Sequence, residues 1–313
     1  MKNQKILLLS LSLLLSQAAL VPGQAKELNW EKHNKAGVKN IEKNDYEGAE
    51  KNLKKAVATA HQFREPGMKM GTSLGHLGLA YMAQGKYPQA EKALSHAIEI
   101  KMRSMGATNE ELVPDLNNLA KVYIAMGRYA SAEPLLQQVL QIKQKTVGAD
   151  HPSLEPTLRE LGTVYSVNGQ FAEAEGYFKR AEVIIEKSPG LQHNLVPVLN
   201  DMASMYKSKG NLPEAEAHYK RILELDEKSL SPKDPTLASD LNNLASVMMS
   251  LSNYAGAEPL LKRAVDIQKS NRKSPKELPI VMESYANCLR KLYKNAEADK
   301  VEAQIHAMAK KNH

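Results

Sequence analysis

The stretch that decides the fold reads Leu116-Asn-Asn-Leu-Ala-Lys-Val-Tyr123, followed by Gly127-Arg-Tyr129 and then Ala132-Glu-Pro-Leu-Leu136. The same order of residues returns between Leu241 and Leu261. Self-similarity at a fixed period is the sequence signature of a repeat protein, in which each repeat is one small structural unit. The architecture can therefore be worked out from one repeat and its spacing.

Each repeat has a small residue at the centre of its first segment and an alanine twelve residues later. The small residues are Gly37, Gly78, Ala120, Gly162, Ala203, Ala245 and Ala286, and they are 41 or 42 residues apart. The alanines are Ala49, Ala90, Ala132, Ala174, Ala215, Ala257 and Ala298. We therefore predict seven repeats, near 30–66, 71–108, 113–150, 155–191, 196–232, 238–273 and 279–309.

The apolar pattern inside a repeat is helical. Apolar residues in 116–123 recur at positions i, i+3, i+4 and i+7, which form one face of a helix. Gly127 is expected to end that helix, because glycine accepts the left-handed conformation found just beyond a helix end. A second helix is predicted through 132–139. Because one helical hairpin cannot bury its apolar face alone, the repeats should stack into a solenoid.

Small residues and prolines locate the contacts and the starts of the helices. A Gly or Ala at a helix crossing allows close approach, so Ala132→Leu should overpack the crossing and cost roughly 1–3 kcal/mol. Pro88 and Pro213 fall where second helices should start, a position that tolerates the missing N–H. Pro134 and Pro259 fall about one turn later, where we expect them to delay or bend the helix.

These motifs resemble the tetratricopeptide repeat, in the long variety found in kinesin light chains and in many bacterial proteins. The resemblance implies an all-α, right-handed superhelical solenoid of about seven hairpins, with the first helices lining a concave, peptide-binding groove. In that variety the paired asparagines are similar to residues that bond the main chain of a peptide. Here they correspond to Asn117-Asn118 and Asn242-Asn243, with a partial match at Asn200-Asp201.

Helical geometry also predicts which residues face a groove. Positions one, two and five after the first leucine point away from the core stripe, and Asn suits main-chain capture because its amide both donates and accepts. Two other interpretations remain open: ordinary solvated residues, or asparagines that bond the adjacent repeat. The candidate groove residues are Asn117, Asn118, Lys121, Arg159, Thr163, Asn200, Ser204, Asn242, Asn243 and Ser246, accompanied by Glu160 and Asp201.

The first 25 residues have the pattern of a secretory signal peptide. Lys2 and Lys5 precede the apolar run 6–15, and small residues follow at Gly23-Gln24-Ala25. The run is shorter than the roughly 20 residues that span a bilayer. We therefore expect an exported protein, with 26–313 as the solenoid, in a periplasm, at the envelope or outside the cell. An uncleaved anchor and a buried N-terminal helix are the alternatives.

Composition bounds the function further. The formal charge is +7 at pH 7, but the basic residues are spread along the chain without a nucleic-acid-binding module, so we expect no nucleic-acid partner. Cys288 is the single cysteine, which excludes an intrachain disulfide. Because it has no nearby histidine in the sequence, we interpret it as a packing residue. The nine histidines show no paired metal-ligand spacing.

Phosphate-binding loops, dinucleotide fingerprints and nucleophile elbows are also missing, so we predict no catalytic residue, no metal and no cofactor. The leading hypothesis is a scaffold that binds a protein or peptide in the groove of the repeats. A self-associating structural component of an envelope assembly is the alternative, with a homo-oligomer as its consequence. An enzyme with a site assembled from distant residues is the third hypothesis.

Overall fold

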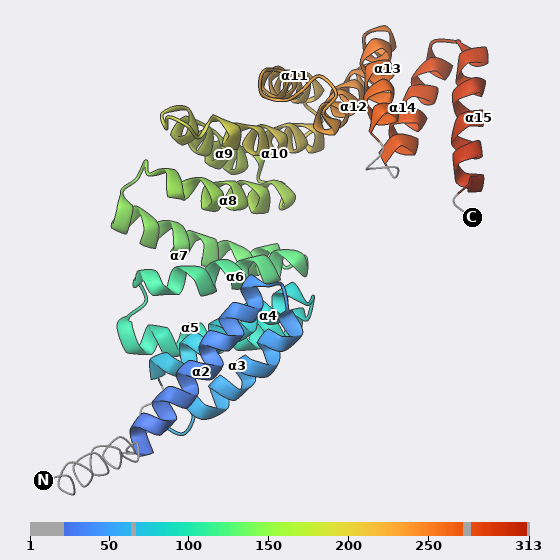
Figure 1. Cartoon of the computed structure of the whole chain (residues 1–313). Coiled ribbons are helices and arrows are strands. Elements are labelled where there is room, and N and C mark those ends of the chain that lie inside the picture. The colour runs from blue at the N-terminus through green and yellow to red at the C-terminus, as the bar shows by residue number, and fades with distance from the viewer. Residues whose placement is uncertain (1–21, 64–66, 272–276, 312–313) are drawn as a thin grey trace, which may run out of the picture. The chain divides into compact units, whose positions relative to one another are not determined.

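The computed structural model describes residues 22–63, 67–271 and 277–311. Within these ranges every regular element is helical, with fourteen α-helices and three short 3-10 helices. Consecutive α-helices pair as hairpins, as Figure 1 shows, which confirms the predicted all-α repeat architecture. The basic start and apolar run of the predicted signal peptide lie outside the described residues. In the described part, no helix is long and apolar enough to span a bilayer.

The chain divides into two compact units, 1–148 and 149–313. The first unit holds the hairpins α2 (Pro22–Glu42) with α3 (Tyr46–Ala60), α4 (Gly67–Ala83) with α5 (Tyr87–Met105), and α6 (Val113–Ala125) with α7 (Tyr129–Val147). The second holds α8 (Glu155–Val167) with α9 (Phe171–Glu186), α10 (Leu195–Ser208) with α11 (Leu212–Ser229), α12 (Pro235–Ser250) with α13 (Tyr254–Ser270), and α14 (Glu277–Lys291) with α15 (Asn295–Lys311). The 3-10 helices Glu110–Leu112, Pro152–Leu154 and Gln192–Asn194 precede α6, α8 and α10.

The small residue of each first helix makes the close contact that the sequence predicts. A methyl group added at Gly37 would lie 2.5 Å from Leu53 Cγ, and one added at Gly162 would lie 2.5 Å from an aromatic carbon of Phe178. Because such distances are far below van der Waals contact, the helices can approach this closely only where no side chain intervenes. All seven repeat alanines, including Ala132, are fully buried, which confirms the register.

The turn inside each hairpin has one conformation throughout the described chain. The seventh residue after the small residue has a positive φ in every repeat, between 58° and 80°. Glycine occupies this position four times, as predicted for Gly127, and Asn44, Ser252 and Tyr293 occupy the other three. Residues other than glycine adopt this region only at an energetic cost, so the backbone is strained at these three residues.

The prolines are accommodated differently from the expectation in two places. Pro88 and Pro213 lie in the first turn of α5 and α11, as predicted. The expected delay at Pro134 and Pro259 is wrong, because α7 and α13 already begin five residues earlier and continue through the proline. Each proline is the sixth residue of its helix, so it removes one regular hydrogen bond near the helix start without delaying that start.

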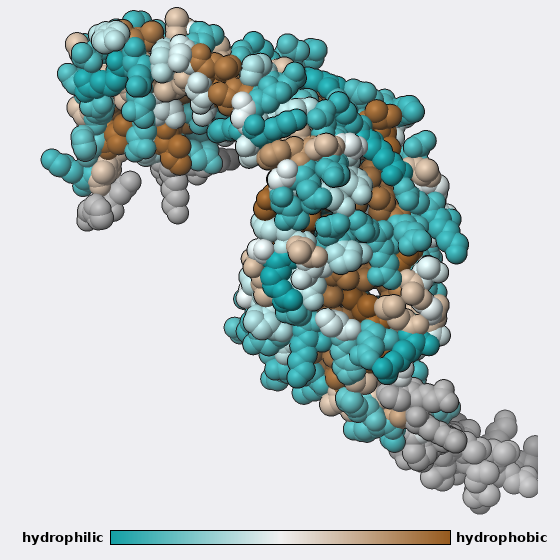
Figure 2. Space-filling view, turned by 180° about the vertical axis from the view of Figure 1, so that it is seen from behind, coloured by the Kyte–Doolittle hydropathy of each residue, from teal (hydrophilic) through white to brown (hydrophobic). Residues whose placement is uncertain are grey.

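Side-chain pairs join successive hairpins within each unit. Between the first two hairpins, Trp30 Nε1 donates to Ser73 Oγ at 3.0 Å, and Ser73 Oγ donates to Asn34 Oδ1 at 3.1 Å. Between the next two, Lys101 on α5 forms an ion pair with Asp115 on α6. On the face seen in Figure 2, hydrophilic side chains cover most of the described surface and hydrophobic ones form separate patches.

Candidate functional site

The predicted groove residues occupy equivalent positions on the first helices α6, α8, α10 and α12. Lys121 and Ser204 are exposed, and the others are half-buried. A half-buried polar residue can reach a ligand, but it can equally bond a neighbouring hairpin. The hydrogen bonds of the individual side chains distinguish these two roles.

In Asn117 and Asn242, the side-chain carbonyl oxygen is buried and has no hydrogen-bond donor within the described residues. These two oxygen atoms are therefore not solvated. A buried acceptor without a partner costs roughly 1–3 kcal/mol, so a ligand that supplied a donor, or turned the amide, would relieve this cost. The two residues are equivalent in their repeats, which makes the unpaired oxygen a recurrent feature of the asparagine pairs.

Several other predicted residues are already engaged in the structure. Arg159 Nε lies 2.7 Å from Asp201 Oδ2, which joins α8 to α10, and its Nη1 lies 3.5 Å from Glu155 Oε1. Burial raises the pKa of Asp201, and Arg159 opposes this shift. Asn200 Nδ2 donates to Val196 O in its own helix at 3.2 Å. Here the polar side chains of the first helices bond other groups of the protein.

A pocket of about 330 Å³ lies at the same face of the second unit, between α12 and α14. Only Ser246 among its lining residues was predicted from the sequence. The α12 side is formed by Ser246, Met249 and Ser250, and the α14 side by Ser284, Asn287 and Lys291, with Tyr254 between them. Ser284 and Asn287 stand two and five positions after Met282, the seventh-repeat equivalent of the first leucine, so applying the same rule to that repeat would have found them. Met249, Ser250 and Lys291 lie one helical turn beyond such positions.

The pocket combines an apolar base with several polar groups. Ser250 Oγ donates to Ser246 O and Ser284 Oγ donates to Ile280 O, so both hydroxyls keep free lone pairs that can accept hydrogen bonds. Lys291 is exposed and forms no ion pair with any described residue. The pocket therefore offers acceptors, an Asn amide and one cation, and this set can bind main-chain N–H groups and a carboxylate.

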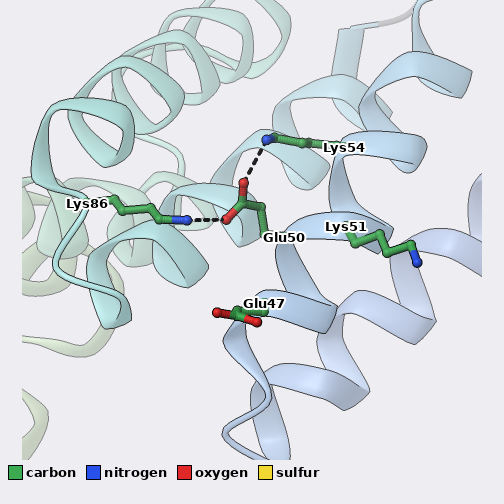
Figure 3. Close-up of a pocket in the computed structure, with 5 residues that line it drawn as sticks. All are labelled: Glu47, Glu50, Lys51, Lys54 and Lys86. Carbon is green, nitrogen blue, oxygen red and sulfur yellow. Dashed lines mark hydrogen bonds and ion pairs between the residues drawn. The ribbon is translucent and has the colours of Figure 1, made fainter.

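A second polar pocket, of about 390 Å³, lies on α3 and the start of α5 in the first unit (Figure 3). Glu50 lies between Lys54 and Lys86, at 2.6 Å and 2.8 Å, and these hydrogen bonds lower the pKa of Glu50 to about 2. Lys51 points away from Glu50 in Figure 3. Because Glu50 already pairs with two of the lysines, this pocket is largely a self-contained ion-pair cluster on the second helices.

The described residues contain neither a metal-binding cluster nor an activated cysteine. No cluster of three or more His, Cys, Asp or Glu side chains is placed to hold a metal ion within those residues. Cys288 is fully buried, and its thiol donates to Tyr254 O at 3.3 Å. Burial raises the pKa of this thiol, so the thiolate form needed for nucleophilic attack is disfavoured.

Comparison with known proteins agrees with the repeat architecture. Family models described as tetratricopeptide repeat match residues 71–109, 112–187 and 195–270. No curated protein matches the chain by sequence. Among solved structures, kinesin light chain nearly identical TPR-like repeats from Podosopora anserina are 24% identical over 64% of this chain and 96% of that one, with a TM-score of 0.56.

Two further structures cover more of the chain at lower identity. A tetratricopeptide repeat protein from Parabacteroides merdae is 16% identical over 90% of this chain and 93% of its own, with a TM-score of 0.61. The apo quorum sensor NprR from B. thuringiensis is 15% identical over 98% of this chain and 94% of its own, also with a TM-score of 0.61. These likenesses show the fold.

Proposed function

Because the chain belongs to the tetratricopeptide repeat family, we propose that it is a scaffold that binds a protein segment on the first helices of its second unit. The observation that carries this proposal is the pocket between α12 and α14, which lies at the predicted binding face and includes Ser246. Asn242 and Asn243 precede Ser246 on the same helix, within one turn. A segment bound there could contact the pocket and both amides.

The chemistry of the pocket favours an extended peptide with an acidic residue. Ser250 and Ser284 can accept from main-chain N–H groups, and Asn287 can both donate and accept. Lys291 is the charged residue of the pocket, and a peptide carboxylate would give it a partner. Met249 adapts its shape to varied apolar side chains. The likeness to a quorum sensor is consistent with a binding protein of this architecture.

The predicted signal peptide adds a location to this proposal. We propose that the chain is exported and that its partner is a protein of the envelope or the exterior.

A crosslinked pull-down tests the proposed site. The bait is the full chain with a C-terminal tag, expressed in its native host, and it is compared with the triple variant Asn242→Ala/Asn243→Ala/Lys291→Ala. We expect the variant to lose a partner that the unaltered chain captures. The matched control is Lys51→Ala/Lys54→Ala, which alters the pocket of Figure 3 and should keep that partner.

The other outcomes are equally informative. If the triple variant and the control capture the same partners as the unaltered chain, the binding site lies elsewhere and the proposal fails. If the chain captures only copies of itself, the self-associating envelope component becomes the better hypothesis. Circular dichroism of each variant must match that of the unaltered chain, so that loss of binding is not loss of fold.

A further inference from the structure

Asp226 and Asp240 lie at the junction of the fifth and sixth hairpins, at positions that hold opposite charges elsewhere in the chain. Asp226 on α11 is eleven residues after its repeat alanine, and Asp240 on α12 is five residues before its repeat small residue. The equivalent positions at the junction of the second and third hairpins hold Lys101 and Asp115, which form a buried ion pair at 2.7 Å. In the second unit, a carboxyl group replaces the lysine.

The two carboxyl groups are buried, at register positions that are in contact in the Lys101–Asp115 pair. Asp226 is 9% exposed and Asp240 is 5% exposed, and a side-chain hydrogen bond with Asp226 contributes to the raised pKa of Asp240. An ionised carboxylate can only accept hydrogen bonds, so two carboxyl groups can bond each other only if one carries a proton. Oδ2 of Asp240 is buried and has no hydrogen-bond partner among the described residues. The burial of both carboxyl groups and the unpartnered oxygen therefore favour a proton on Asp240.

The charges that act on Asp240 all favour its protonated form. Asp226 faces it from α11, and Asp234 acts from the turn before α12, where it caps Thr236 N. No charged group from α13 or α14, which also pack on α12, acts on Asp240 within the described residues. Burial, the largest effect, and Asp226 together raise the pKa of Asp240 to about 7.

We propose that Asp240 holds a proton that it donates to Asp226, forming a proton-dependent lock between the fifth and sixth hairpins. With the proton in place, the hydrogen bond holds α12 against α11. When Asp240 ionises, two like charges face each other in a buried site and the junction loosens. The pH at which this occurs lies near neutrality rather than near the ordinary value for aspartate.

The sign of the effect follows from linkage. A carboxyl whose pKa is raised by folding stabilises the folded form below its unfolded value of about 3.9, and this contribution is lost as the pH rises toward 7. His218, on α11, acts in the opposite direction because burial lowers its pKa. A junction that loosens as pH rises therefore cannot be explained by this histidine.

The lock is also placed to act on the candidate binding face. Asn242, Asn243 and Ser246 follow Asp240 on α12. If the proposed binding function holds, loosening this junction would displace these residues, so ligand affinity would fall at alkaline pH. The lock itself does not depend on that function, and it can be tested without a ligand.

Hydrogen exchange of the full chain at pH 5.5 and pH 8, corrected for the intrinsic pH dependence of exchange, tests the lock. We expect amide protection in peptides of α11 and α12 to be roughly tenfold lower at pH 8 than at pH 5.5. The reason is that pH 8 lies about one unit above the pKa of Asp240, and each such unit changes the ratio of ionised to protonated carboxyl tenfold. Asp240→Asn should remove this pH dependence, since an amide donates to Asp226 at any pH. The control Asp266→Asn, at an exposed residue of α13, should keep it.

A second variant, Asp226→Lys, recreates the charge pattern of Lys101 and Asp115 at this junction. It should form an ion pair with Asp240, and protection should then be equal at the two pH values. Unchanged protection of the unaltered chain between pH 5.5 and pH 8 would overturn the lock. So would a pH effect of the original size in both Asp240→Asn and Asp226→Lys.

Discussion

Lys101 Nζ lies 2.7 Å from Asp115 Oδ2, in an ion pair that connects α5 to α6. The side chains of the two residues are only 10% and 5% exposed. Burial raises the pKa of Asp115 in spite of the neighbouring lysine, so desolvation outweighs the attraction in this shift. Gly75 makes room for the pair, because a Cβ there would lie 2.3 Å from Asp115 Oδ1. The pair is thus buried in a site that fits it closely.

Asp115→Asn should destabilise the first unit by about 3–5 kcal/mol, because it leaves the buried Lys101 charge without its counterion. Urea unfolding of the full chain, followed by hydrogen exchange in α5 and α6, measures this loss. The double variant Lys101→Met/Asp115→Leu removes both charges and should recover most of the stability. Equal stability of the Asn variant and the unaltered chain would contradict the account of this pair.

Gly162→Ala should destabilise the fourth hairpin by roughly 1–3 kcal/mol, since the added methyl would meet the ring of Phe178. Phe178 is almost fully buried and has little room to move. In the third hairpin the equivalent residues are Ala120 and Leu136, so Gly162→Ala/Phe178→Leu copies a natural combination. Thermal melting should show that the double variant is more stable than Gly162→Ala, and a double variant that is no better would disprove the pairing.

Tyr293→Gly should stabilise the last hairpin by about 0.5–1 kcal/mol. Tyr293 has a φ of 61° and is 89% exposed, so glycine relieves backbone strain and removes little packing. The strain of an L-residue in this region is about 1–2 kcal/mol, and the greater freedom of glycine in the unfolded chain offsets part of the gain. In the opposite test, Gly210→Ala at a φ of 80° should be destabilising. Thermal melting compares the two variants with the unaltered chain.

Glu50→Gln should reduce the loss of stability that occurs when the pH is lowered from 7 to 3. The pKa of Glu50 is lowered to about 2 by its hydrogen bonds to Lys54 and Lys86. This stabilisation is therefore present above the unfolded value of about 4.3, and it is lost as the pH falls from there toward 2. Melting temperatures at pH 7 and pH 3 should differ less in the variant than in the unaltered chain. Identical differences would show that the cluster does not contribute.

The sequence predicts the hairpins well because their contacts repeat. The small residues, such as Gly162, and the repeat alanines, such as Ala132, each mark a close helix crossing, and a period of 41 or 42 residues averages out local irregularities. The behaviour of Pro134 was not predicted, since it depends on how many turns precede the proline. That number is set by where the helix begins, which is the least certain feature of a sequence pattern.

The candidate site was less predictable, because equivalent positions have different partners. Arg159 looks like a groove residue until Asp201 is found 2.7 Å away on the next first helix. Lys291 lies one helical turn beyond the predicted positions and enters the site because α14 packs beside α12. Asp226 and Asp240 lie fourteen residues apart on two helices, and the contact between them follows from stacking rather than from any motif.

The residue pairs that lie between successive hairpins respond differently to a change in pH. At the junction of the fourth and fifth hairpins, Ile185 and Val198 occupy the same register positions. Both side chains are buried and apolar, so they carry no charge to titrate. Where Lys101 and Asp115 meet, separation of the hairpins would expose two opposite charges. Where Asp226 and Asp240 meet, it would release a proton. Mild alkali should therefore loosen the junction of Asp226 and Asp240 while leaving the apolar junction unaffected, so the order in which the hairpins come apart depends on the surrounding medium as well as on the fold.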